Sequence, residues 1–220
     1  MANAPQSAPA GQRVSPVKAP FTITPLQQRQ KWLKMLVYGK PGAGKTTLLG
    51  SAADVPAMCD ILLIDVESGT LTLHGNERIQ NPDKIMTISL HDFKTMDAIY
   101  KWIQAHVHFR DTGDMEKLAS IEEQVTGVKP TNPKIFKTII VDSISEVDNM
   151  SFGAIQGVDE DMNLTDDIPS SEWSHYNQNN VRMMLLLRRL RNLPINILLS
   201  SLAKWVQDEH KKFHYGPALK

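Results

Sequence analysis

Cysteine is nearly absent from the chain, which has 220 residues and a single Cys59. One thiol cannot form a disulfide framework or a cluster of thiolate ligands, and it suits a reducing compartment. Long apolar runs are missing too: none could span a bilayer, and the N-terminus lacks the apolar centre of a signal peptide. These absences exclude a disulfide-stapled secreted domain, and they predict a cytoplasmic protein with no membrane partner.

An excess of either charge is also lacking, because 24 basic residues balance 24 acidic ones. No global field therefore draws the chain to nucleic acid or to an anionic membrane, although a local basic groove is compatible with this balance. Apolar residues make up 41% of the chain, which is enough for one α/β domain with a buried core.

Two kinds of segment alternate along the chain. Short apolar runs predict strands at 34–38, 60–65, 84–89, 136–142 and 195–201. Helical spacing or a helix-opening context predicts helices at 46–53, 93–109, 144–155 and 171–192. Strands that alternate with helices indicate the α/β class: a three-layer fold whose mostly parallel sheet has helices on both faces.

Three segments lack an apolar period. Residues 1–25 are rich in Pro, Ala, Ser and Gln, so we expect a disordered arm, with the folded domain at 26–220. Residues 110–134 are charged and irregular in pattern, which predicts an insertion or a mobile surface segment. Residues 157–171 are acidic and predict a mobile loop.

A glycine-rich loop follows the first expected strand and has the sequence GKPGAGKT. The pattern G-x-x-x-x-G-K-[ST] between a strand and a helix is the phosphate-binding loop of P-loop nucleotide-binding proteins. In this motif the glycines let backbone N–H groups approach phosphates, Lys45 supplies a positive charge to the β- and γ-phosphates, and the Thr46 hydroxyl ligates Mg²⁺. The expected nucleotide-binding residues are Gly39, Lys40, Pro41, Gly42, Ala43, Gly44, Lys45, Thr46 and Thr47.

An apolar strand, TIIVD, ends in the carboxylate of Asp142. Many strands end in an acidic residue, but downstream of a phosphate loop this pattern favours an aspartate that holds Mg²⁺ through water. Ser143 follows, and it could either cap the next helix or contact the metal's water shell.

The general base that activates water needs a carboxylate near the phosphates. In the AAA+ pattern a glutamate follows the metal aspartate, whereas here Ser143 stands in that place. The alternative is Glu67, just past the 60–65 strand, because ligands of parallel sheets bind at the carboxyl ends of the strands. A solvated turn with a helix-capping role would explain the same residues.

Three segments, GKPGAGKT, LLIDVESG and TIIVDSISEV, together resemble the RecA-type ATPase core. Within it the chain is most similar, from about Lys34 onward, to phage-encoded RecA-like proteins, the Sak-type single-strand annealing ATPases also described as AAA-family ATP-binding proteins. The resemblance implies ATP and Mg²⁺ as cofactors, ATPase activity with Glu67 as catalytic base beside Lys45, and Asp142 as the Mg²⁺ partner. It also implies a homo-oligomer with ATP at a subunit boundary, and a phage protein in the host cytoplasm.

The resemblance places a γ-phosphate sensor at Ser200 or Ser201. This position in the family often carries His or Gln, whereas the sequence here is Ser-Ser-Leu. RecA-like domains usually also continue with more strands than the chain has after this point, which suggests a truncated product.

Single-stranded DNA is the partner that the resemblance implies, through loops expected at 153–171 and 202–217. The second loop interleaves Lys204, Lys211 and Lys212 with aromatic residues, a composition that suits a single strand. A polar connection with its aromatics packed on the core would have the same composition. Lys204, or an arginine of the 182–191 segment, could instead act as a trans-acting finger toward a neighbour's ATP.

We therefore favour an ATPase of phage DNA recombination or single-strand annealing. A P-loop phosphotransferase acting on a small molecule is the second hypothesis, and it would need a lid with several arginines near the phosphates. The third is a regulatory ATP-binding switch or a motor without a recombination role.

Overall fold

The structure, a computed structural model, describes residues 32–158, 162, 165, 167, 170–207 and 211–219. The expected arm at 1–25 and most of the expected acidic loop at 157–171 lie outside the described residues. Within the described part of the chain, no helix combines the length and the apolarity that crossing a membrane requires.

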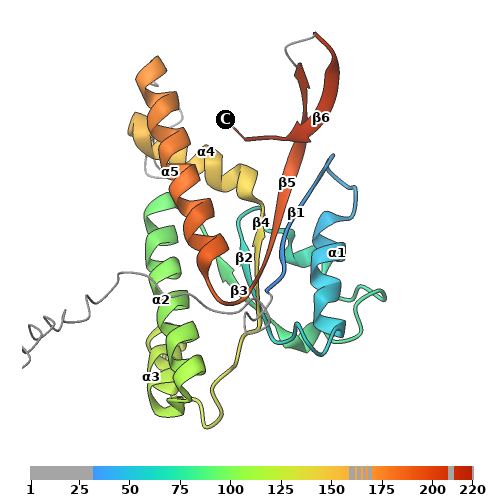
Figure 1. Cartoon of the computed structure of the whole chain (residues 1–220), viewed down its shortest axis with the longest axis vertical. Helices are drawn as coiled ribbons and strands as arrows, with labels where there is room; N and C mark the ends of the chain where they lie inside the picture. Colours follow the sequence, from blue (N-terminus) through green and yellow to red (C-terminus); the bar gives the residue numbers. More distant parts are fainter. Residues whose placement is uncertain are drawn as a thin grey trace, which may run out of the picture. The chain divides into compact units, whose positions relative to one another are not determined.

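A mostly parallel sheet forms the centre of the described chain (Figure 1). Its strands are β1 (Lys34–Gly39), β2 (Ile61–Asp65), β3 (Ile85–Ser89), β4 (Thr138–Asp142), β5 (Asn196–Gln207) and β6 (Phe213–Pro217). The spatial order is β1-β5-β4-β2-β3, all parallel, and β6 pairs antiparallel with the far half of β5. The register places Asp65 beside Asp142, so the carboxyl ends of neighbouring strands meet at one edge of the sheet.

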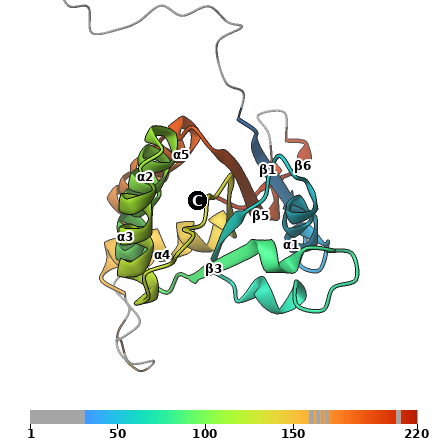
Figure 2. The same ribbon diagram turned by 90° about the horizontal axis from the view of Figure 1, so that it is seen from below.

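Helices cover both faces of the sheet, as Figure 2 shows from below. They are α1 (Lys45–Gly50), α2 (Phe93–Thr112), α3 (Met115–Thr126), α4 (Ile144–Gln156) and α5 (Trp173–Asn192), with short 3-10 turns η2 (Ser51–Asp54), η3 (Gly69–Thr72) and η4 (Pro82–Lys84). α1 covers one face, and α2, α4 and α5 cover the other. The predicted three-layer α/β class with a mostly parallel sheet is confirmed.

Alternate residues of the central strands enter two separate cores. Leu62 and Ile64 of β2 join the core under α2, α4 and α5, whereas Ile61 and Leu63 join the core under α1. Both faces of β2 and β4 are buried, which explains why each strand is an unbroken apolar run in the sequence. Full burial of one such side chain contributes about 1.5–3 kcal/mol, so these strands hold the carboxyl-end edge rigidly in place.

Residues 110–134, expected as an insertion or a mobile surface segment, are helical over much of their length. α2 continues to Thr112, and α3 occupies Met115–Thr126 with its N-terminus capped by Asp114, whose carboxylate accepts from Lys117 N at 3.1 Å. Only Leu118 and Ala119 of α3 are buried, because the helix packs beside α2 rather than on the sheet. So narrow an apolar stripe is hard to recognise among charged residues.

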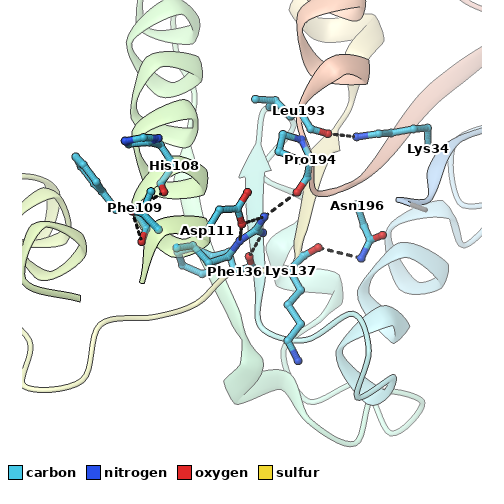
Figure 3. Close-up of polar contacts among 11 residues, drawn as sticks. Lys34, His108, Phe109, Asp111, Phe136, Lys137, Leu193, Pro194 and Asn196 are labelled. Carbon is cyan, nitrogen blue, oxygen red and sulfur yellow. Dashed lines mark hydrogen bonds and ion pairs between the residues drawn. The ribbon is translucent and has the colours of Figure 1, made fainter. Parts of the chain in front are cut away.

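Polar contacts tie the amino ends of the strands together (Figure 3). Arg110 of α2 donates to the carbonyl oxygens of Phe136 and Pro194, at 3.2 and 2.7 Å. Lys34 Nζ donates to Leu193 O at 2.7 Å. These hydrogen bonds link α2, β1 and the segments that lead into β4 and β5. The amino ends of the strands are therefore covered by the protein itself, so we expect ligands to bind at the carboxyl ends.

Candidate nucleotide-binding site

The phosphate loop runs from the end of β1 to the start of α1. Gly42 and Gly44 have φ angles of 74° and 82°, a left-handed conformation that favours glycine, and Gly44 is the N-cap residue of α1. Lys45 Nζ donates to the carbonyl oxygens of Gly39 and Lys40, both at 3.1 Å. These contacts hold the ammonium group of Lys45 over the phosphate loop. The N-terminus of α1 points at the same loop, and the two positive groups together suit anionic phosphates.

Thr46 and Asp142 lie together, as their expected metal role requires. The Thr46 hydroxyl donates to Asp142 Oδ2 at 2.5 Å, and the hydroxyl of Ser200 on β5 donates to the other carboxylate oxygen, Oδ1. Asp142 is only 3% exposed. A Cβ added to Gly69 would lie 3.3 Å from Asp142 Oδ2, so the glycine lets the chain after β2 pass close to this pair.

Glu67 lies in a tight turn after β2. The carboxylate of Asp65 accepts from Gly69 N at 2.9 Å, from Thr70 N at 3.3 Å and from the Thr70 hydroxyl at 2.8 Å. Ser68, at the centre of the turn, has a φ of 57°. The turn-and-capping interpretation of this segment therefore applies to Asp65, while Glu67 and Ser68 are exposed.

Ser143 contacts Glu67 directly. Its hydroxyl donates to Glu67 Oε1 and also accepts from Glu146 N at 3.4 Å as the N-cap of α4. The capping interpretation of Ser143 is confirmed, and the contact with Glu67 adds a second role.

These elements surround a cleft of about 500 Å³. It is lined by Pro41, Gly42, Ala43, Gly44, Lys45, Thr46, Thr47, Glu67, Gly69, Thr72, Asp142, Glu146 and Leu202. Most of the expected nucleotide residues and both expected acidic residues thus lie at one cavity. The lining comes from the loop after β1, the turn after β2, the end of β4, the first turn of α4 and the middle of β5.

The two candidate sensor residues are fully buried behind the cleft. Ser200 reaches Asp142, whereas Ser201 Oγ lies 2.8 Å from Ser145 Oγ, and the latter also accepts from Leu202 N at 3.0 Å. Both serines therefore join β5 to β4 and α4, and neither is part of the cleft wall.

The remaining candidates, Lys204, Lys211 and Lys212, lie on a hairpin and not in the cleft wall. The expectation of a loop after Ser201 was wrong, because β5 continues to Gln207 and β6 returns beside it. This stretch has exposed side chains of mixed polarity, so it lacks the apolar run that marked the first half of β5. The rings of Trp205 on β5 and Tyr215 on β6 contact each other in a tilted arrangement, with centroids 3.9 Å apart and planes at 36°.

Four residues of the cleft wall were not anticipated: Gly69, Thr72, Glu146 and Leu202. The spacing Ser143-x-x-Glu146 is a capping-box signal, and it would have placed Glu146 in the first turn of α4, next to Asp142. Gly69 and Thr72 reach the cleft through the fold of the chain after β2, and Leu202 reaches it from within β5.

A family model described as an AAA domain matches residues 31–218. The chain belongs to this AAA domain family. Its AAA domain is therefore a P-loop ATPase domain, with Ser143 in the place that the AAA+ pattern gives to glutamate.

Other comparisons add little to this assignment. Among solved structures the AAA domain is similar to the pCW3 conjugation coupling protein TcpA, in a monomer form with ATPgS, at 13% identity and a TM-score of 0.36. The similarity covers 77% of this chain and 42% of that one. No curated protein matches the sequence.

Proposed function

We propose that this AAA domain binds ATP with Mg²⁺ and hydrolyses it. We further propose that the energy of hydrolysis drives recombination or annealing of single-stranded DNA, as in the phage proteins that the sequence resembles. The observation that carries the ATPase proposal is the single cleft shared by the phosphate loop, the Thr46–Asp142 pair and Glu67. The DNA proposal rests on the hairpin of β5 and β6 together with the resemblance.

The donor groups suit a hard divalent cation. The hydroxyl of Thr46 and the carboxylate of Asp142 supply oxygens only, which is the chemistry that Mg²⁺ prefers, and they are 2.5 Å apart beside the loop. We propose that these two residues hold Mg²⁺, which when bound neutralises phosphate charge.

Each protein group then has a defined role. Lys45 and the backbone N–H groups of the loop bind the β- and γ-phosphates. Glu67 takes a proton from a water molecule whose oxygen forms a bond to the γ-phosphorus, while the bond from that phosphorus to the bridging oxygen breaks and ADP leaves. A positioned general base contributes about 10²–10⁴-fold to such a rate.

The hairpin has the composition of a single-strand binding surface. Trp205 is 59% exposed and Phe213 65% exposed; Lys204 lies on β5, and Lys211 and Lys212 come just before β6. Exposed rings stack on bases in a sequence-tolerant way while lysines neutralise phosphates. This surface is linked to the cleft, because Lys40 Nζ of the phosphate loop lies 5.6 Å from the ring centroid of Tyr215.

An ATP-bound homo-oligomer is part of the same proposal. No arginine lines the cleft among the described residues, so a charge-stabilising finger would come from a second copy, with Lys204, Lys211 or Lys212 as candidates besides arginine. The same feature disfavours the small-molecule phosphotransferase, which would need several arginines near the phosphates.

The test is the rate of Mg²⁺-dependent ATP hydrolysis with and without single-stranded DNA. We expect DNA to raise the rate several-fold, and Glu67→Gln to bind ATP as the unmodified protein does but to lose turnover by about 10²–10⁴-fold. Full turnover by Glu67→Gln would show that the base lies elsewhere. Transfer of phosphate to a metabolite, with no response to DNA, would support the phosphotransferase instead.

A further inference from the structure

The hydroxyl of Ser143 has two partners from different parts of the chain. Glu146 N, in the first turn of α4, donates to its oxygen, and the hydroxyl's own proton goes to Oε1 of Glu67, which follows a different strand. A hydroxyl can accept and donate at the same time, so capping the helix leaves the proton free for the carboxylate. Ser143 is 0% exposed, so its hydroxyl is not in contact with bulk water.

Helix capping alone does not account for the geometry. The cap distance at Ser143 is 3.4 Å, whereas the aspartate caps of α2 and α3 lie 2.9 and 3.1 Å from the backbone N–H groups that they accept. The cap of α4 is thus the longest of the three, and the Ser143 hydroxyl also donates to Glu67. The side chain therefore serves Glu67 as well as the helix end.

Glu67 needs such a partner because the rest of its side chain is poorly constrained. It is exposed at the rim of the cleft, and the hydrogen bonds of Asp65 order the backbone of its turn without reaching its carboxylate. Within the described part of the chain Oε1 bonds to Ser143, and Oε2 makes no hydrogen bond. One oxygen is held by the protein and the other is available to a water molecule.

We propose that Ser143 is a positioning residue, which holds the carboxylate of Glu67 at the cleft so that its second oxygen can take the proton of the attacking water. This inference rests on the proposed function, and specifically on Glu67 as the base. It assigns to the residue after Asp142 the task of orienting a glutamate in the turn that follows the neighbouring strand β2. The register that pairs Asp65 with Asp142 makes this reach possible.

The experiment is a double-mutant cycle on the full chain with Ser143→Ala and Glu67→Gln, measured as steady-state hydrolysis of radiolabelled ATP. Ser143→Ala should lower kcat about tenfold, with KM and ATP affinity within about twofold, since a misplaced catalytic group lowers the rate and leaves binding intact. In the Glu67→Gln background, Ser143→Ala should lower the rate no further, because the group that it orients is already gone.

Asp114→Ala is the matched control for loss of a helix cap. It removes the cap of α3, outside the cleft, and should lower Tm while leaving kcat unchanged. If Ser143→Ala has the kcat of the unmodified protein while Glu67→Gln is inactive, the role of Ser143 is overturned but that of Glu67 stands. The same conclusion follows if Ser143→Ala lowers kcat by an equal factor in the unmodified protein and in Glu67→Gln. Full turnover by Glu67→Gln would overturn the assignment of Glu67 and this role of Ser143 with it.

Discussion

Replacing Ser200 with alanine removes the hydroxyl that donates to Asp142 Oδ1 and leaves that oxygen without its partner. Ser200 is 0% exposed and Asp142 is 3% exposed, so water cannot enter as a substitute. Leaving a buried acceptor unsatisfied costs about 1–3 kcal/mol, and charged groups lie at the upper end. For a domain of this size 1 kcal/mol moves Tm by about 2–4 °C, so a loss of about 2 kcal/mol predicts a fall of roughly 4–8 °C.

Ser151 on α4 offers a matched control. It too is 0% exposed, but its hydroxyl has no hydrogen-bond partner among the described residues. Ser151→Ala likewise removes a serine hydroxyl from a fully buried position, but it leaves no hydrogen-bond partner unsatisfied. We therefore expect its Tm to be unchanged or slightly higher, because a buried unpaired hydroxyl is itself unfavourable.

Both variants are compared with the unmodified protein by thermal unfolding, followed by circular dichroism at neutral pH without nucleotide. The expected order of Tm is Ser200→Ala lowest, with Ser151→Ala at or above the unmodified protein. Equal shifts for the two variants would refute the reasoning, since they would show that burial of the serine, and not its bond to Asp142, determines the effect.

Three further predictions concern binding and pH. Lys45→Ala should weaken ATP binding at least about hundredfold, or about 2.7 kcal/mol, by calorimetric titration, and unchanged affinity would refute the phosphate-loop assignment. Trp205→Leu should weaken binding of a labelled single-stranded oligonucleotide by about 1–3 kcal/mol, measured by fluorescence anisotropy. Trp173 is an exposed aromatic residue on α5, and Trp173→Leu should leave this binding unchanged. Equal losses of affinity in the two variants would contradict a DNA-binding surface on the hairpin. Burial lowers the pKa of His106 below its usual 6.5, so the unfolded chain binds more protons and stability should fall as pH drops below about 6.5. His106→Gln should flatten this fall in urea unfolding, and an identical pH slope would contradict it.

Local patterns predicted the parts of the site that are local in structure. Gly42 and Gly44 are needed wherever a loop takes left-handed backbone conformations, and the strand-loop-helix context of Lys45 is continuous in sequence. β2 and β4 each contain a continuous apolar run because both faces are buried, so their positions and the carboxylates that end them could be predicted from the sequence pattern.

Contacts that depend on strand register could not be predicted in this way. Ser143 meets Glu67 only because β4 lies beside β2 with Asp142 paired to Asp65, and no local pattern specifies that neighbour. The same holds for Ser200, which reaches Asp142 because β5 lies between β1 and β4. The far half of β5 was missed for another reason: its exposed side chains are of mixed polarity, so it has no apolar run.

The continuity of β5 restricts how the length of this chain can vary. The strand passes without interruption from Ser200, bonded to Asp142, to Trp205 on the hairpin, a distance of about 16 Å at the usual rise per residue. Inserting one residue between them would turn every later side chain to the opposite face, whereas inserting two would restore the original faces. Related chains should therefore differ in length between these two positions only by even numbers of residues, even where their sequences here are different.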